Sequence, residues 1–185
     1  MDPQQARTRL MAECSRKEIS ARQARQWLQK HEVPEPEIKQ IINGLVKDKY
    51  IDDSRFAKAF TRDKLRFSKW GPDKIRIGLS DAGIDKIIAQ QAIEEEESLS
   101  LQILSDLLSK KQKELERKQE KKIAEAKSQI QLLKKTPGDL KSQRKIYALQ
   151  TKIRTSNQQI HAALMAFAVR KGFPLTQIST VLKDF

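Results

Sequence analysis

Apolar residues recur with a helical period along almost the whole chain. The clearest stripe has the spacing i, i+3, i+4, i+7, i+8 and consists of Ile38, Ile41, Ile42, Leu45 and Val46. Pro34 or Pro36 is suited to the first turn of that helix, because a proline there sacrifices no helical hydrogen bond. Stripes of this kind predict an all-α chain.

The middle of the chain is predicted to hold two further helices separated by a sharp break. Asp52 or Asp53 can cap the first of them. One side of that helix is expected to be lined by Phe56, Phe60 and Phe67. Gly71-Pro72 then breaks the chain, and Gly83 ends the next helix in the usual C′ position. The buried face of this second helix is expected to consist of Ile75, Leu79 and Ala82.

One pattern of fixed spacing occurs three times. An apolar residue is followed after four residues by a corner residue and after five by an apolar plug, and an isoleucine comes nine or ten residues after the start. The three sets are Leu28-Glu32-Val33-Ile38, Leu79-Gly83-Ile84-Ile88 and Ala168-Gly172-Phe173-Ile178. We interpret each as part of a three-helix unit, with chance agreement between helical hairpins as the alternative. The predicted units cover residues 1–49, 50–97 and 98–185.

The third unit contains a long insertion. Leu28 and Leu79 lie 51 residues apart, whereas Leu79 and Ala168 lie 89 apart, a surplus of 38 residues. Apolar positions at near-heptad spacing on both sides of Thr136-Pro137-Gly138-Asp139 predict a helical hairpin at about residues 110–155. An arm from Lys110 to Lys135 would be roughly 40 Å long. A single charged helix or partial disorder is the alternative.

Composition narrows the class of protein further. The 185 residues include only 6 Gly and 6 Pro, which disfavours a β-sandwich or barrel, and the 38% of hydrophobic residues are periodic, which disfavours full disorder. The single Cys14 excludes an internal disulfide, and two histidines leave little for a metal site, so we expect no metal and no cofactor. No apolar run approaches a membrane span, and the N-terminus lacks a signal core. A soluble cytoplasmic protein is expected.

The net charge of +13 is concentrated in one stretch of the chain. Residues 98–159 carry 15 basic and 6 acidic side chains, whereas residues 51–97 carry 9 and 10. An excess of this size favours an anionic partner, either a nucleic acid or an acidic protein surface.

No arrangement of residues in the sequence supports catalysis. Phosphate-binding glycine loops, zinc-protease, nucleophile-elbow and CxxC motifs are all absent. Asp52 and Asp53 are adjacent, and we interpret them as helix caps rather than as an acid/base pair. We therefore expect that the protein is not an enzyme.

Cations beside the two tryptophans are the candidate contacts for a partner. They are Arg22, Arg25 and Lys30 around Trp27, and Arg62, Lys64, Arg66, Lys69, Lys74 and Arg76 around Trp70. Such side chains can contact phosphates or acidic protein loops. The alternative is a solvated face of amphipathic helices. The tryptophans themselves are expected to pack in the core rather than to stack on bases.

Several segments resemble the RecX family of bacterial recombinase regulators. They are Tyr50-Ile51-Asp52-Asp53-Ser54-Arg55-Phe56-Ala57, Lys69-Trp70-Gly71-Pro72-Asp73-Lys74-Ile75 and Leu79-Ser80-Asp81-Ala82-Gly83-Ile84. The C-terminal Phe167-Ala168-Val169-Arg170-Lys171-Gly172-Phe173 is similar to the last repeat of that family. Order and spacing agree from about Arg7 to Leu182, apart from the insertion. Glu32 departs from the pattern, because this corner is often glycine in the family.

The resemblance implies an elongated, crescent-like stack of three-helix units without catalytic residues. It also implies binding to the RecA nucleoprotein filament and inhibition of RecA ATPase, recombinase and strand-exchange activity, in homologous recombination, DNA repair and the SOS response. Some members of the family also bind DNA, and we expect a monomer. The motif residues are expected to determine the fold rather than to contact a partner: Tyr50, Asp52, Asp53, Arg55, Phe56, Trp70, Gly71, Gly83, Gly172 and Phe173.

Two other functions stay open at this point. The chain could bind single- or double-stranded DNA, or RNA, without sequence preference through its basic face and hairpin. It could also assemble with itself through a coiled coil at residues 110–160.

Overall fold

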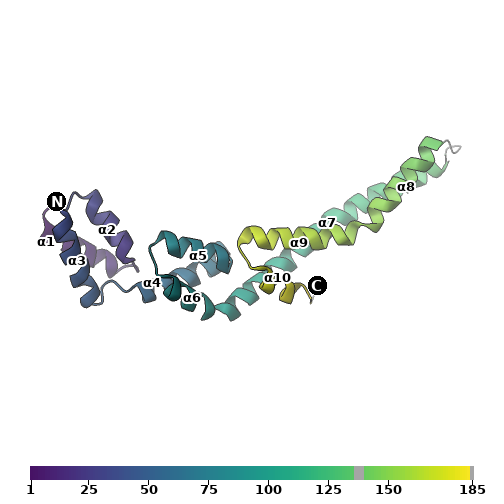
Figure 1. Ribbon diagram of the computed structural model, residues 1–185. Helices are drawn as coiled ribbons and strands as arrows, with labels where there is room; N and C mark the ends of the chain where they lie inside the picture. Colours follow the sequence, from purple (N-terminus) through teal and green to yellow (C-terminus); the bar gives the residue numbers. More distant parts are fainter. Residues whose placement is uncertain (136–139, 184–185) are drawn as a thin grey trace. The chain divides into compact units, whose positions relative to one another are not determined.

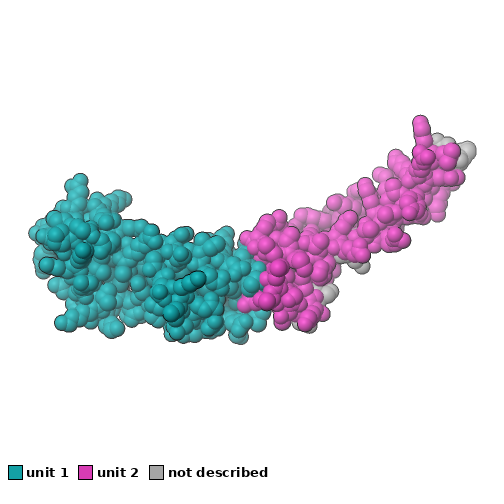
Figure 2. Space-filling view, viewed as in Figure 1, with its two compact units in different colours: residues 1–103, 171–174 teal, residues 104–170, 175–185 magenta. Residues whose placement is uncertain are grey.

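The computed structural model describes residues 1–135 and 140–183. All regular structure in these ranges is helical (Figure 1), which confirms the predicted all-α class. The chain forms two compact units (Figure 2), of which the first comprises residues 1–103 with 171–174 and the second residues 104–170 with 175–185. The finer division into repeats at 1–49, 50–97 and 98–185 stays a prediction.

The first three helices of unit 1 pack around a common core. They are α1 (Pro3–Cys14), α2 (Ala21–Lys30) and α3 (Glu35–Lys47). The buried residues of this cluster are Ala6, Leu10, Ile19, Ala24, Leu28, Val33, Ile38, Ile41, Leu45 and Ile51. The predicted stripe is therefore confirmed at its centre, while Ile42 is only partly buried and Val46 is 43% exposed. Pro34 is the N-cap of α3, and Pro36 lies in its first turn.

In the rest of unit 1, one α-helix continues directly into a short π-helical turn. Its elements are α4 (Asp53–Asp63), the π-helical turn η1 (Lys64–Ser68), α5 (Pro72–Asp81) and α6 (Lys86–Glu94). Phe56 and Phe60 share the predicted side of α4, with ring centroids 5.7 Å apart. The prediction for Phe67 is wrong, because its side chain is 80% exposed. Phe67 lies within η1, where hydrogen bonds from i to i+5 place an extra residue in the turn, so side chains in this turn no longer continue the face of α4.

The three predicted corners share one backbone geometry. Their central residues all have positive φ: 56° at Glu32, 79° at Gly83 and 86° at Gly172. The apolar plugs that follow them are all buried, and they are Val33, Ile84 and Phe173. Left-handed backbone favours glycine, so Glu32 adopts it at a cost of about 1 kcal/mol. The departure from glycine at this position therefore leaves the corner intact.

Unit 2 is built mainly from long helices. The helices from here to the C-terminus are α7 (Glu97–Lys135), α8 (Leu140–Arg154), α9 (Ser156–Lys171) and α10 (Leu175–Leu182). Within unit 2, α7 lies beside α8 and α9 (Figure 1), as a helical hairpin requires. The predicted arm from Lys110 to Lys135 forms the second part of α7, which begins at Glu97 and comprises 39 residues. The predicted turn at 136–139 lies outside the described residues.

Candidate functional site

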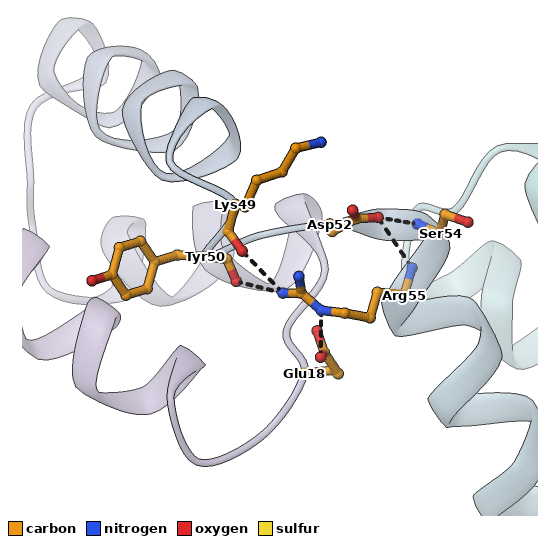
Figure 3. Close-up of polar contacts among 6 residues, drawn as sticks. All are labelled: Glu18, Lys49, Tyr50, Asp52, Ser54 and Arg55. Carbon is orange, nitrogen blue, oxygen red and sulfur yellow. Dashed lines mark hydrogen bonds and ion pairs between the residues drawn. The ribbon is translucent and has the colours of Figure 1, made fainter.

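The segment from Tyr50 to Arg55 joins the ends of helices in unit 1 (Figure 3). The carboxylate of Asp52 caps α4 by accepting hydrogen bonds from the backbone N–H groups of Ser54, at 3.0 Å, and Arg55, at 3.1 Å. These bonds, that of Arg55 foremost, hold the pKa of Asp52 below its ordinary value. The predicted role of Asp52 as a helix cap is thus confirmed.

Arg55 connects three parts of the chain through one guanidinium group (Figure 3). Its Nε donates to Glu18 Oε1 at 2.6 Å, and its Nη2 donates to the carbonyl oxygens of Lys49, at 3.1 Å, and Tyr50, at 3.2 Å. The bond to Glu18 is the main cause that raises the pKa of Arg55. Two carbonyls at the end of α3 are thereby satisfied by a charged donor.

The carboxylate of Asp53 accepts a hydrogen bond from a residue outside its own helix. Its Oδ1 accepts a hydrogen bond of 2.9 Å from the backbone N–H of Ala21, the first residue of α2. The two adjacent aspartates therefore accept hydrogen bonds at the N-termini of different helices and do not face each other as a pair.

Gly71 occupies a place where the backbone of another segment passes directly over it. Its N–H donates to the carbonyl of Lys171 at 2.7 Å, and the N–H of Asp73 donates to the carbonyl of Gly172 at 2.9 Å. A Cβ atom on Gly71 would stand closer than 3.0 Å to backbone atoms of Gly172 and Phe173. The glycine is therefore required by a close backbone approach, since its own φ of −84° is open to any residue.

The corner at Gly83 packs against the start of α2 in a similar way. A Cβ on Gly83 would stand closer than 3.0 Å to the aliphatic stem of Arg22. Beside it, the buried hydroxyl of Ser20 donates to the carbonyl of Ala82 at 2.7 Å. Arg22, a predicted partner contact, thus covers the corner with its stem while the residue remains exposed overall.

Trp70 lies between two lysines of unit 1. The Nζ atom of Lys64 is 4.9 Å from the centroid of its ring, and that of Lys74 is 4.7 Å away. The ring is half-buried, so the expectation that it packs in the core holds only for part of its surface. Each cation–π contact of this kind contributes about 0.5–1 kcal/mol at an exposed site.

Three of the predicted contact residues already have acidic partners within the chain. Arg25 pairs with Glu35 on α3, and Arg62 pairs with Glu96, which is the main cause that raises the pKa of Arg62. The third is Arg76, which pairs with a carboxylate of its own helix at 2.8 Å. An ion pair within the fold lowers the charge that these arginines can offer to a partner.

The other predicted cations are not neutralised in this way. Lys64 and Lys74 contact Trp70, and Lys30, Arg66 and Lys69 form no salt bridge within residues 1–135 and 140–183. Six of the predicted cations form no salt bridge in these ranges, and four of the six, Lys64, Arg66, Lys69 and Lys74, lie in residues 64–74, which we call the 64–74 segment. Its backbone includes Lys69 in the left-handed region, with φ of 55°.

Phe67 was not among the contact residues predicted from the sequence, although it belongs to this segment. An aromatic side chain that is 80% exposed and stands between Arg66 and Lys69 has the chemistry of an interface residue, since aromatic residues and arginine dominate binding hot spots. The helical spacing of apolar residues predicted that Phe67 is buried, because this spacing does not reveal a π-helical turn. The basic residues on either side of it were the available signal.

The described residues contain no cluster of three or more His, Cys, Asp or Glu side chains that could hold a metal ion. Among the same residues, no helix combines the length and the apolar character needed to cross a bilayer. Burial raises the pKa of the Cys14 thiol, which disfavours a reactive thiolate.

Comparisons of the sequence with known proteins find similarity to one family. Residues 52–93 match the family model described as RecX, second three-helix domain. The regulatory protein RecX of Oceanobacillus iheyensis is 34% identical over 109 residues, which are 56% of this chain and 38% of that protein. The regulatory protein RecX of Staphylococcus carnosus is 31% identical over 55% of this chain and 39% of its own length. The matched region thus spans well under half the length of these curated relatives.

Two solved structures share the fold of this chain. The crystal structure of RecX from Lactobacillus salivarius superposes with a TM-score of 0.68 at 19% identity, over 98% of this chain and 95% of that one. A second crystal structure, of a regulatory protein RecX, gives a TM-score of 0.61 at 16% identity, over 99% of this chain and 72% of that one. At such low identity these likenesses concern the fold alone.

Proposed function

Because the chain belongs to the RecX family, we propose that it is a non-enzymatic regulator that binds the RecA nucleoprotein filament and inhibits RecA ATPase, recombinase and strand-exchange activity. The name of its relatives, regulatory protein RecX, supports a regulatory role. A role on this filament implies that the protein works in the cytoplasm, and we propose that it acts as a monomer.

The observation that carries the proposal is the 64–74 segment. It lies inside the matched family region of residues 52–93, and it presents an exposed Phe67 among cations that form no salt bridge in the described structure. An aromatic ring with flanking cations fits an acidic protein surface, because the ring supplies apolar contact and the cations supply steering. We infer that this segment contacts the filament.

The proposed mechanism needs no chemistry from this chain. A protein that contacts several filament subunits at once gains affinity from multiple attachment points. It would favour one conformation of the filament over others, and it would thereby hinder the conformational changes tied to nucleotide hydrolysis. A small number of bound molecules would then restrain many subunits.

The proposal is tested by titrating the protein into the single-stranded-DNA-dependent ATPase reaction of RecA from the same organism, at physiological salt. We expect suppression at well below one molecule per RecA. Phe67→Ala combined with Arg66→Ala should raise the half-inhibitory concentration about tenfold or more, as for loss of a hot spot, with an unchanged melting temperature. Lys39→Ala, an exposed cation on α3, is the matched control and should inhibit like the wild type.

The two parts of the proposal fail in different ways. If the wild type leaves the ATPase unchanged even in excess, the regulatory function is wrong for this chain. If the wild type inhibits and the double variant inhibits equally well, the function stands and the 64–74 segment is not the contact.

A second candidate function is direct, sequence-independent binding of DNA or RNA. The excess of basic residues in 98–159 favours it, because such cations release counterions from phosphates. Affinity for a fluorescent oligonucleotide should then fall steeply between low and physiological salt without any RecA. A flat salt dependence would exclude this function.

A further inference from the structure

A groove with an apolar floor runs along unit 2 between α7 on one side and α8 and α9 on the other. Its volume is about 630 Å³. The apolar part of its lining consists of Leu115, Ile123, Ala126, Leu149, Ile153, Ile160 and Ala163. Lys118, Lys122 and Lys152 also line it, and Glu125 is the only acidic residue in the lining.

The groove exists because two helices cannot cover each other's apolar stripes completely. In the described part of α8 no residue is buried, and on α7 Leu115 and Ile123 are only half-buried. Three or more helices are needed to enclose a stripe of this width, as in a helical bundle. The groove therefore has the form of a position for one additional helix.

The dimensions of the groove set the length of an occupant. On α7 the lining extends from Leu115 to Gln129, which corresponds to roughly 20 Å, or about four helical turns. A helix of that length offers apolar side chains at i, i+3 or i+4, i+7 and i+11 to such a floor.

The charged residues around the apolar floor of the groove indicate which kind of partner would bind there. Lys118 is paired with Glu114, whereas Lys122 and Lys152 form no salt bridge in the described residues. These two lysines against one glutamate favour an acidic occupant and oppose a second copy of this chain, whose corresponding segment is itself strongly basic. Nucleic acid fits less well, because the lining holds no aromatic side chain on which bases could stack, and phosphates gain nothing from an aliphatic floor. An amphipathic helix satisfies the apolar floor and the cations together.

We propose that this groove binds an amphipathic helix of a partner protein, apolar on one face and acidic along its flanks. The apolar face fills the floor between α7, α8 and α9, and the acidic flanks meet Lys122 and Lys152 on the two sides of the groove. The binding site is separate from the 64–74 segment and does not depend on the role proposed for it.

The test uses the whole chain of 185 residues and a fluorescent synthetic peptide. The peptide has about 15 residues and spans four turns, with leucine at the core positions and glutamate on both flanks. Its binding is followed by fluorescence anisotropy at physiological salt. We expect saturable binding to the wild type and none to a peptide in which lysine replaces every glutamate. Lys122→Glu combined with Lys152→Glu should weaken binding about tenfold or more, because attraction becomes repulsion on both sides.

A matched pair of variants separates the groove from general electrostatics. Lys121→Glu with Lys141→Glu makes the same change of charge at exposed positions outside the lining and should change the affinity less than about twofold. Ala163→Phe should block binding by filling the floor while the charge stays constant. Far-UV circular dichroism of every variant checks that the helices remain formed.

Several results would overturn the proposal. They are absence of saturable binding to the wild type, equal loss in the two charge variants with folded helices, and full binding to Ala163→Phe. Displacement of the peptide by single-stranded DNA that depends on the same two lysines would assign the groove to nucleic acid. Dimers in sedimentation that the peptide dissociates would assign it to a second copy.

Discussion

Replacing Gly71 by alanine should destabilise unit 1 for a purely steric reason. The φ of −84° is accessible to alanine, but its Cβ would stand closer than 3.0 Å to backbone atoms of Gly172 and Phe173. Backbone cannot rotate away as a side chain does, so the start of α5 and residues 171–174 must separate. The variant therefore measures how much this close backbone contact contributes to the free energy of unfolding.

The cost follows from the hydrogen bonds that cross the contact. Separation removes the bond from Gly71 N–H to the Lys171 carbonyl, at 2.7 Å, and that from Asp73 N–H to the Gly172 carbonyl, at 2.9 Å. Each contributes about 0.5–1.5 kcal/mol, and Gly71 is buried, so an unpaired donor adds about 1 kcal/mol or more. The free energy of unfolding should fall by about 2–4 kcal/mol.

Urea unfolding, monitored by circular dichroism, measures this change in the free energy of unfolding. Hydrogen exchange of the Gly71 and Asp73 amides shows whether the loss of protection occurs at this contact. Gly44→Ala is the control, because a Cβ on Gly44 in α3 meets nothing within 4 Å. There the free energy of unfolding should rise by about 0.5–1 kcal/mol through the higher helix propensity of alanine. A loss below about 0.5 kcal/mol in Gly71→Ala, or unchanged protection of both amides, would refute the reasoning.

Three further predictions follow from exposure and charge. Phe56→Ala should lower the free energy of unfolding by about 3–5 kcal/mol, because Phe56 is 5% exposed, whereas Phe67→Ala at 80% exposure should change it by less than about 0.5 kcal/mol in the same urea titration. Arg55→Met removes three hydrogen bonds of a partly exposed side chain and should cost about 1–2 kcal/mol; a value as small as that of Phe67→Ala would contradict its structural role. In a carboxyl NMR titration, hydrogen bonds from Lys111 and Lys118 should lower the pKa of Glu114 to about 2; the associated stabilisation is present above a pH of about 4 and is lost as the pH falls toward 2. An ordinary titration of Glu114 would mean that these ion pairs are absent in solution.

Local features of the fold could be predicted from the sequence alone. The cap at Asp52 and the corners at Gly83 and Gly172 depend on residues within a few positions of one another, so the residue types suffice to place them. The periodic stripe from Ile38 to Leu45 similarly determines which face of α3 is buried. The order and spacing of such residues also carry the resemblance to the RecX family.

Other features depend on contacts between distant segments. Gly71 looked like an ordinary turn glycine, and only the passage of residues 171–174 explains why no side chain fits there. Phe67 satisfied the helical period, yet it lies within the π-helical turn Lys64–Ser68, and its ring is exposed to solvent.

The candidate site divides in the same way. The sequence by itself determined an all-helical chain with cations gathered beside its tryptophans, because composition and periodicity are properties of the chain. Only the tertiary structure decided that Arg25 and Arg62 are paired, since folding brings Glu35 and Glu96 to them, whereas Arg76 pairs with a carboxylate three residues before it in the same helix. Two of those carboxylates lie 10 and 34 residues away in the sequence, a separation at which no local pattern reports a contact.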